Sequence, residues 1–281
     1  MLDLSIVTPS YNYRPYISDC LDSVAHQSTP CREHLIIENG STDGSFELIS
    51  NHPAPKRLLQ QEHTGLAVTL ERLLAAAEGE WVGWQNADDF YLPTAFSSLA
   101  NALKIHPDSD IFVGDTVFMA QNASVVRLLG AHRVSLPVAL HYEMVPYAPC
   151  SYFFRRQMAV DVGVRLDTKF LMDKWLLADM LRAGAKASWA PTPLGVMRRH
   201  PDQVSATYAG DLGKEEREQF RRGVGIPHKG FGAAASIAYG RAVHVGLKVR
   251  DGAYRREFEW NRRRGFDCRW WTDADHWMRS L

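Results

Sequence analysis

Apolar and polar positions alternate regularly along the first 95 residues. Short apolar runs have the length and β-branched content of buried strands, and they cover residues 4–9, 33–37, 56–60 and 81–84. Between them lie segments with the three- and four-residue spacing of amphipathic helices, at 15–25, 46–49 and 66–77. This order predicts a doubly wound, mostly parallel α/β sheet with right-handed crossovers.

The pattern continues less regularly to about residue 207. Helical spacing appears at 94–106, 157–162 and 170–182, and strand-like runs appear at 110–115, 117–119 and 147–156. The runs at 187–190 and 195–198 suggest a terminal hairpin. Residues 122–145 are expected to form a mostly irregular connection with room for one helix.

Three of the predicted strands end in polar turns, at 8–12, 38–43 and 86–89. Because parallel strands end at the same edge of a sheet, these turns should line one crevice, where such folds bind ligands. Asp88 and Asp89 are adjacent carboxylates, which favours a hard divalent cation such as Mg²⁺ or Mn²⁺ between them and a phosphate. The alternative is a solvated turn that caps the helix after Pro93.

The composition of the chain argues against several classes of protein. The 281 residues are 46% hydrophobic and 23% charged with a net charge of zero, so nucleic-acid binding is not expected. Four widely separated cysteines form no metal-ligand pattern and indicate free thiols in a reducing compartment. The N-terminus lacks a secretion signal, and no run approaches about 18 apolar residues, so a cytoplasmic protein is expected.

Six motifs follow one another along the chain, at 8–12, 38–45, 74–89, 151–156, 173–176 and 198–200. Their order and spacing resemble the inverting glycosyltransferases of family two, which have the GT-A fold and use nucleotide-sugar donors. The resemblance covers about residues 3–207. It implies a GT-A (Rossmann-like) α/β domain at 1–207, with helices on both faces of a mostly parallel sheet. Its nucleotide-binding half would be about 1–95 and its acceptor-side half about 96–207, followed by a helical extension at 208–281.

The resemblance also implies roles for single residues. Tyr11 would stack on the base, and Glu38, where the family usually has Asp, would accept the uracil N–H. Asp88 would contact the ribose or sugar, and Asp89 would bind the metal, with His200 as a further ligand. The full set of implied donor contacts is Pro9, Tyr11, Glu38, Ser41, Asp88, Arg198 and Ser205.

Asp173 is the implied general base. Transfer from a nucleoside diphosphate builds negative charge on the leaving phosphate, which a cation at Asp89 together with Arg198 and His200 would stabilise. The acceptor hydroxyl must lose a proton as it attacks, and one carboxylate base without a carboxylate nucleophile predicts inversion. Contact with Lys174 would oppose a rise in the pKa of Asp173. The alternative is that Asp173 has no catalytic role and its negative charge only stabilises the first turn of the helix through the helix dipole.

The expected function is therefore transfer of a sugar, from a UDP-sugar by preference, to a hydroxyl of a glycan or lipid-linked acceptor. A non-catalytic nucleotide-sugar-binding partner protein is the alternative. A nucleotidyltransferase is disfavoured because residues 8–12 are not a Gly-rich basic loop.

The segment from Asp211 onward is basic, with 15 Lys or Arg and 10 Asp or Glu. Arginine clusters at 255–256 and 262–264 precede tryptophans at 270, 271 and 277. This segment is expected to pack as helices on the catalytic domain or on a second subunit of a homo-oligomer. The alternative is peripheral contact with the inner face of the cell membrane.

Overall fold

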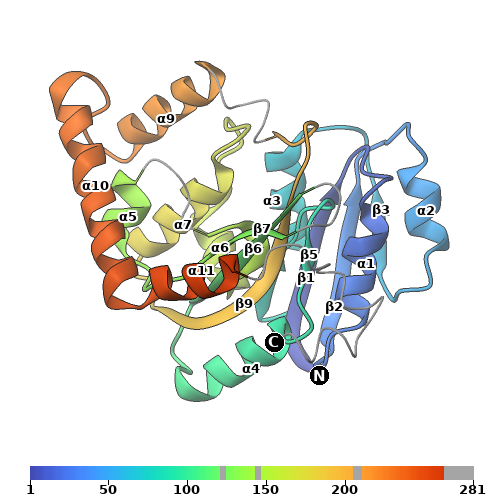
Figure 1. The fold of residues 1–281 in the computed structure, drawn as a ribbon. Coiled ribbons are helices and arrows are strands. Elements are labelled where there is room, and N and C mark those ends of the chain that lie inside the picture. Colours follow the sequence, from blue (N-terminus) through green and yellow to red (C-terminus); the bar gives the residue numbers. More distant parts are fainter. Residues whose placement is uncertain (121–124, 143–146, 205–210, 263–281) are drawn as a thin grey trace.

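The computed structural model describes residues 1–120, 125–142, 147–204 and 211–262 (Figure 1). Within these residues a nine-stranded sheet has the order β3-β2-β1-β4-β8-β6-β9-β5, and β7 pairs with β6. The N-terminal strands β1 (Leu2–Ser10), β2 (Cys31–Glu38), β3 (Arg57–Gln60) and β4 (Trp81–Trp84) pair in parallel. The four strands predicted within the first 95 residues are thus confirmed, and the nucleotide-binding role of this half stays a prediction.

Helices cover both faces of this parallel part. Ile36 of β2 packs with α1 (Ile17–Ala25) and α2 (Ser45–Asn51) on one face. Its neighbours Leu35 and Ile37 pack with α3 (Leu66–Ala76) on the other face. Successive strand residues point to opposite faces, so the continuous apolar run of β2 is explained by burial on both sides. Trp81 and Trp84 are 2% exposed and belong to the core, as expected.

The second half of the sheet is mixed, so the expectation of a mostly parallel sheet holds only for the first half. Antiparallel β8 (Tyr152–Arg155) lies between β4 and β6 (Ile111–Ala120). The long β9 (Ala187–Arg199) runs parallel to β6, while β5 (Phe90–Tyr91) and β7 (Val125–Leu129) pair antiparallel at the periphery. The helices of this half are α4 (Ala95–Ile105), α5 (Leu136–His141), α6 (Arg156–Val162) and α7 (Met172–Arg182).

Three local expectations were wrong. Residues 110–115 and 117–119 belong to one strand, because buried Thr116 finds a partner in Ser151 at 2.7 Å between the hydroxyl oxygens. The predicted hairpin at 187–198 is a single strand, and its prolines fall where the register with β6 shifts, so the missing N–H groups break no regular ladder. The connection at 122–145 contains β7 as well as α5.

The C-terminal extension forms α9 (Asp211–Gly223), α10 (Gly230–Arg250) and α11 (Ala253–Asn261), which pack on the second half of the molecule (Figure 1). Helix α10 lies against α5 so closely that a Cβ on Gly240 would be 2.4 Å from the carbonyl carbon of His141. Helix α11 lies against β7, and its Arg256 bonds buried Asp115 of β6 at 3.0 Å. The extension therefore packs on its own chain, and a domain boundary at 207/208 stays a prediction.

Two further expectations concern the chain ends and thiols. Cys20, Cys31 and Cys150 are free, as expected, while Cys268 and the tryptophans at 270, 271 and 277 lie outside the described residues. Among the helices that the structure describes, none combines the length and the apolarity required to cross a bilayer.

Candidate active site

A cavity of about 1800 Å³ opens where β1, β2 and β4 end, and the second half of the molecule forms its other walls. Of the residues predicted to form the site, six line it: Pro9, Tyr11, Asp88, Asp89, Asp173 and His200. Glu38, Ser41 and Arg198 do not line this cavity. Ser205 lies outside the described residues.

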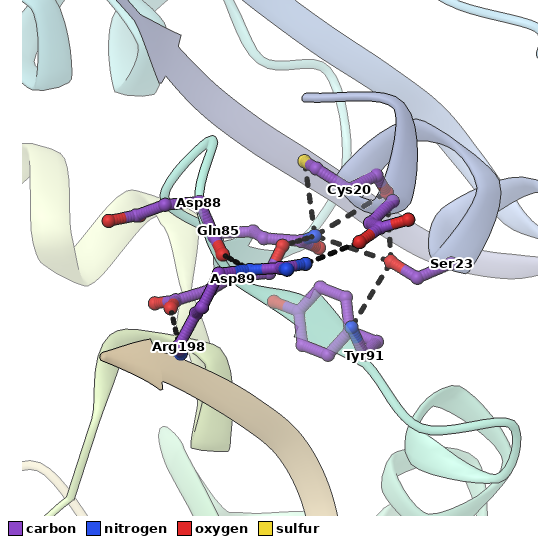
Figure 2. A network of polar contacts seen from close by, with 8 residues as sticks. Cys20, Ser23, Gln85, Asp88, Asp89, Tyr91 and Arg198 are labelled. Atoms are coloured by element: carbon purple, nitrogen blue, oxygen red, sulfur yellow. Dashed lines mark hydrogen bonds and ion pairs between the residues drawn. The ribbon is translucent and has the colours of Figure 1, made fainter. Parts of the chain in front are cut away.

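A polar network connects the turn after β4, which carries Asp88 and Asp89, to helix α1 (Figure 2). The Gln85 side-chain amide donates to the Asp89 carbonyl oxygen at 3.0 Å and to the Cys20 sulfur of α1 at 3.1 Å. The Ser23 hydroxyl oxygen accepts the Tyr91 N–H at 3.1 Å just beyond the turn. The network fixes the two aspartates at the sheet edge.

Arg198, at the end of β9, supports the same turn. Its backbone N–H donates to Asp89 Oδ1 at 3.0 Å, and its side-chain Nε donates to the Asp88 carbonyl oxygen at 3.1 Å. The guanidinium also forms an ion pair with Asp19. Because Arg198 is 5% exposed and bonded on these sides, its observed role is to hold the acidic turn. The contact with a pyrophosphate implied by the sequence stays a prediction.

His200 faces Asp88. Its Nε2 lies 3.0 Å from Asp88 Oδ2, and its ring packs against Tyr16 with 4.4 Å between centroids. The side chain is fully buried, and its Nδ1 has no hydrogen-bond partner in the described part of the chain. Burial and the adjacent Asp88 raise the pKa of Asp89, against the effect of Arg198. A negative charge on Asp89 beside Asp88 is therefore disfavoured, and a nearby cation would favour it.

These residues fit a divalent cation. No three His, Cys, Asp or Glu side chains within the described ranges converge as a complete metal cage. Mg²⁺ does not require one, since it usually binds one or two carboxylates together with substrate phosphates. Asp88, Asp89 and His200 supply oxygen and imidazole donors beside an open cavity.

Tyr11 and His63 form an aromatic pair in the wall of the cavity. Tyr11 is 38% exposed, and its ring centroid lies 4.0 Å from that of His63 at an interplanar angle of 31°. His63 lies in the loop between β3 and α3 and was not expected from the sequence. The loop contains Gly65, whose φ of 86° lies in the left-handed region that favours glycine. This glycine is the signal in the sequence that could have drawn attention to the loop.

Glu38 and Ser41 build the neighbouring loop. The fully buried Glu38 carboxylate accepts the backbone N–H groups of Gly40 at 3.0 Å and Ser41 at 2.8 Å. The Ser41 hydroxyl oxygen accepts the N–H of Asn12 at 2.8 Å, where Asn12 has a φ of 57°. Glu38 therefore fixes the loop after β2, and Ser41 ties that loop to the loop after β1. Their implied contacts with the nucleotide stay predictions.

Asp173 lies in the first turn of α7 and faces the cavity. Burial raises its pKa to about 6, although the N–H and the charge of Lys174 act in the opposite direction. Asp173 Oδ1 accepts that N–H at 2.7 Å, while the Lys174 amine turns away and donates to the Ala139 carbonyl at 2.8 Å. The expected opposition by Lys174 exists, and burial outweighs it.

Glu216 of α9 fixes the segment in front of Asp173. Its carboxylate is 9% exposed and accepts the backbone N–H groups of Lys169, Phe170 and Leu171, the last at 3.0 Å. We call these contacts the Glu216 clamp. The clamp was not expected from the sequence, because charged α9 gave no signal of a buried carboxylate.

Comparisons with known proteins agree with this geometry. The profile described as Glycosyl transferase family 2 matches residues 5–158. TuaG of Bacillus subtilis (strain 168), a glycosyltransferase provisionally assigned to teichuronic acid biosynthesis, is 34% identical over 90 residues. That match covers 31% of this chain and 36% of TuaG. The matches to the first curated relatives span about a third of the relatives' own length.

Two solved structures share the fold. TarS of S. aureus, solved with UDP-GlcNAc, has a TM-score of 0.62 at 18% identity, covering 78% of this chain and 64% of TarS. The mannosyltransferase PcManGT of Pyrobaculum calidifontis, solved with GDP-Man and Mn²⁺, has a TM-score of 0.60 at 18% identity, covering 88% and 75%. The likeness establishes the GT-A type of fold. Because the family profile covers more than half of its residues, the chain belongs to Glycosyl transferase family 2.

Proposed function

We propose that this protein is an inverting transferase that moves a sugar from a nucleoside-diphosphate donor to a hydroxyl of a glycan or lipid-linked acceptor. The observation that carries the proposal is that the acidic turn with His200 and the raised-pKa Asp173 line one cavity. The TarS and PcManGT complexes support a nucleotide-sugar donor. The teichuronic acid assignment of TuaG supports a role in a bacterial cell-envelope polysaccharide.

In this proposal the donor lies across the ends of β1 and β4. Tyr11 and His63 offer aromatic faces to the base, and UDP is the favoured nucleotide from the family resemblance. We assign the metal to Asp88 and His200 rather than to Asp89, which the resemblance implied, because Asp89 is 1% exposed and its Oδ1 accepts the Arg198 N–H. Asp88 and His200 would hold the cation in place of their present hydrogen bond. A bound Mg²⁺ or Mn²⁺ would neutralise the charge that develops on the leaving diphosphate.

Asp173 performs the proton transfer. Its ionised carboxylate accepts the proton of the acceptor hydroxyl while the hydroxyl oxygen attacks the anomeric carbon. The bond from that carbon to the diphosphate oxygen breaks, and its electron pair leaves with the diphosphate. A pKa of about 6 leaves most of Asp173 ionised at neutral pH yet more basic than an ordinary aspartate. One displacement by an external hydroxyl inverts the configuration.

Titration with UDP, with and without Mn²⁺, combined with donor turnover by Asp173→Asn tests the proposal. We expect the variant to keep UDP binding and lose turnover. Asp179→Asn is the matched control, because Asp179 lies on the same helix and pairs with Arg165 outside the cavity. Equal turnover by wild type and Asp173→Asn would exclude Asp173 as the general base. No turnover by the wild type with any of a panel of nucleotide sugars would favour a non-catalytic nucleotide-sugar-binding protein. Peripheral membrane contact and homo-oligomer formation stay predictions.

A further inference from the structure

Two arginines flank one phenylalanine on the acceptor side of the cavity. The guanidinium carbons of Arg127 and Arg199 lie 4.6 Å and 4.8 Å from the centre of the Phe118 ring. Phe118 of β6 is the direct cross-strand partner of Arg127 on β7. It also pairs with Met197 on β9, so Arg199 lies two residues further along on the same face. All three side chains belong to the cavity wall.

The strand geometry separates this group from the acidic turn. Arg198 and His200, which flank Arg199 in sequence, direct their side chains to the Asp88–Asp89 turn. Arg199 lies between them and is directed to Phe118 instead. The opposite face of β6, with Val117 and Met119, belongs to a separate apolar cluster against which Trp260 packs. The arginine pair is thus an independent part of the wall.

Among the described residues, no carboxylate neutralises the charges of this pair. Neither guanidinium has a described carboxylate within 4 Å, whereas the nearby cations Lys248 and Arg256 are paired with Glu257 and Asp115. Partial burial and the charge of Arg127 lower the pKa of Arg199. Two like charges on either side of one ring, both at the wall of a cavity, favour the binding of an anion. Two guanidinium forks match the geometry of a phosphate or carboxylate.

We propose that Arg127 and Arg199, on either side of Phe118, form an oxyanion subsite for a phosphate or carboxylate group of the acceptor. The inference rests on the proposed transferase function, since it names the acceptor class of that same cavity. It assigns an acidic acceptor, either a phosphate-linked one or a glycan with acidic sugars. The donor diphosphate is assigned to the other wall, beside Asp88 and His200.

The subsite can be tested by calorimetric titration of small anions into protein saturated with UDP and Mn²⁺. Methyl phosphate and glucuronic acid are the two probes, and glucose is the uncharged match. We expect one acid to bind the wild type and glucose not to bind. Binding of methyl phosphate identifies the phosphate source, and binding of glucuronic acid identifies the acidic-glycan source. In the double variant Arg127→Met/Arg199→Met the affinity should fall about tenfold or more.

Three comparisons make the result decisive. Arg182→Met removes an exposed charge of α7 outside the cavity and should leave probe binding unchanged. Single Arg→Lys variants keep the charge without the fork and should lose less affinity than the double variant. UDP affinity and the thermal midpoint should stay at wild-type values in the double variant, because both arginines are exposed.

Failure of both acids to bind the wild type, or equal binding by the double variant, would overturn the subsite. So would loss of UDP affinity in the double variant, because the arginines would then serve the donor. If the wild type itself does not bind UDP, the proposed function fails separately. The probes are then titrated without UDP, and the same comparison of variants decides the subsite.

Discussion

Replacing Asp173 by asparagine should abolish transfer and at the same time stabilise the fold at alkaline pH. The ionised carboxylate is unfavourable where it lies, since burial raises its pKa from an ordinary value of 3.8 to about 6. That gap corresponds to about 3 kcal/mol of folding free energy when the group is fully ionised. Asparagine has a similar shape, and its oxygen can still accept the Lys174 N–H. The variant therefore removes the charge and keeps the local hydrogen bond.

The sign of the effect follows from the raised pKa. Below about pH 3 the carboxyl is protonated in both the folded and the unfolded chain, so its ionisation carries no penalty. The penalty grows as pH rises towards 6 and is constant above it, so it is about half as large at pH 5 as at pH 8. Asp173→Asn should therefore gain up to about 3 kcal/mol in unfolding free energy at pH 8 and about half of that at pH 5.

Urea unfolding at pH 5 and pH 8, for wild type, Asp173→Asn and Asp179→Asn, measures this difference. Turnover at saturating donor should fall by about 10²- to 10⁴-fold in Asp173→Asn at neutral pH. Wild-type turnover should rise with pH as the base ionises, from about one tenth ionised at pH 5 to about nine tenths at pH 7. An Asn variant that is less stable than wild type at pH 8, or a wild-type rate that is flat between pH 5 and 7, would refute the argument.

Four further predictions concern three other residues of the site and its surroundings and one helix contact. Asp88→Asn should weaken UDP binding about tenfold or more with Mn²⁺ present and little in its absence, which titration with and without Mn²⁺ measures; equal loss in both conditions would contradict a metal role. Tyr11→Ala should weaken UDP binding about tenfold or more by removing a stacking face, and unchanged affinity would place the base elsewhere. Glu216→Ala should lower turnover more than UDP affinity, because the clamp holds the residues directly before Asp173 and not the residues proposed to bind the nucleotide. A loss of UDP affinity alone would contradict this. Gly240→Ala should lower the unfolding free energy by about 1–3 kcal/mol, because the added carbon clashes with the α5 backbone. Gly246→Ala is the control, since no atom lies within 4 Å of its added carbon. Equal melting temperatures of the two variants would show that the packing of α10 does not depend on this close approach.

Much of the first half of the fold could be predicted because its information is local. The apolar runs of β1, β2 and β4 are buried on both faces, and the polar turns after β1 and β4 line the cavity. Of the turn after β2, only Asn39 does so. Asp88 and Asp89 were accordingly found from the sequence pattern and line the cavity, as does Asp173, which the family resemblance implied. Their chemical roles are the part that remains to be tested.

The second half could be predicted less well because its polar residues find distant partners. Asp115 interrupts the apolar pattern of β6, yet it is 1% exposed because Arg256 arrives from a helix 141 positions later. No local rule reports such a pairing. Arg127 and His63 were missed for the same reason, since neither belongs to a motif and only the fold brings them to the cavity wall.

The Glu216 clamp bears on how members of this family could be recombined. A chimera that joined the first 207 residues to a foreign C-terminal segment would keep the acidic turn and the Tyr11–His63 pair. It would, however, leave three amide groups before Asp173 without their acceptor. Such a hybrid should capture its sugar donor and yet turn over slowly, so shuffling the extension between relatives alters catalysis itself and not only the choice of acceptor.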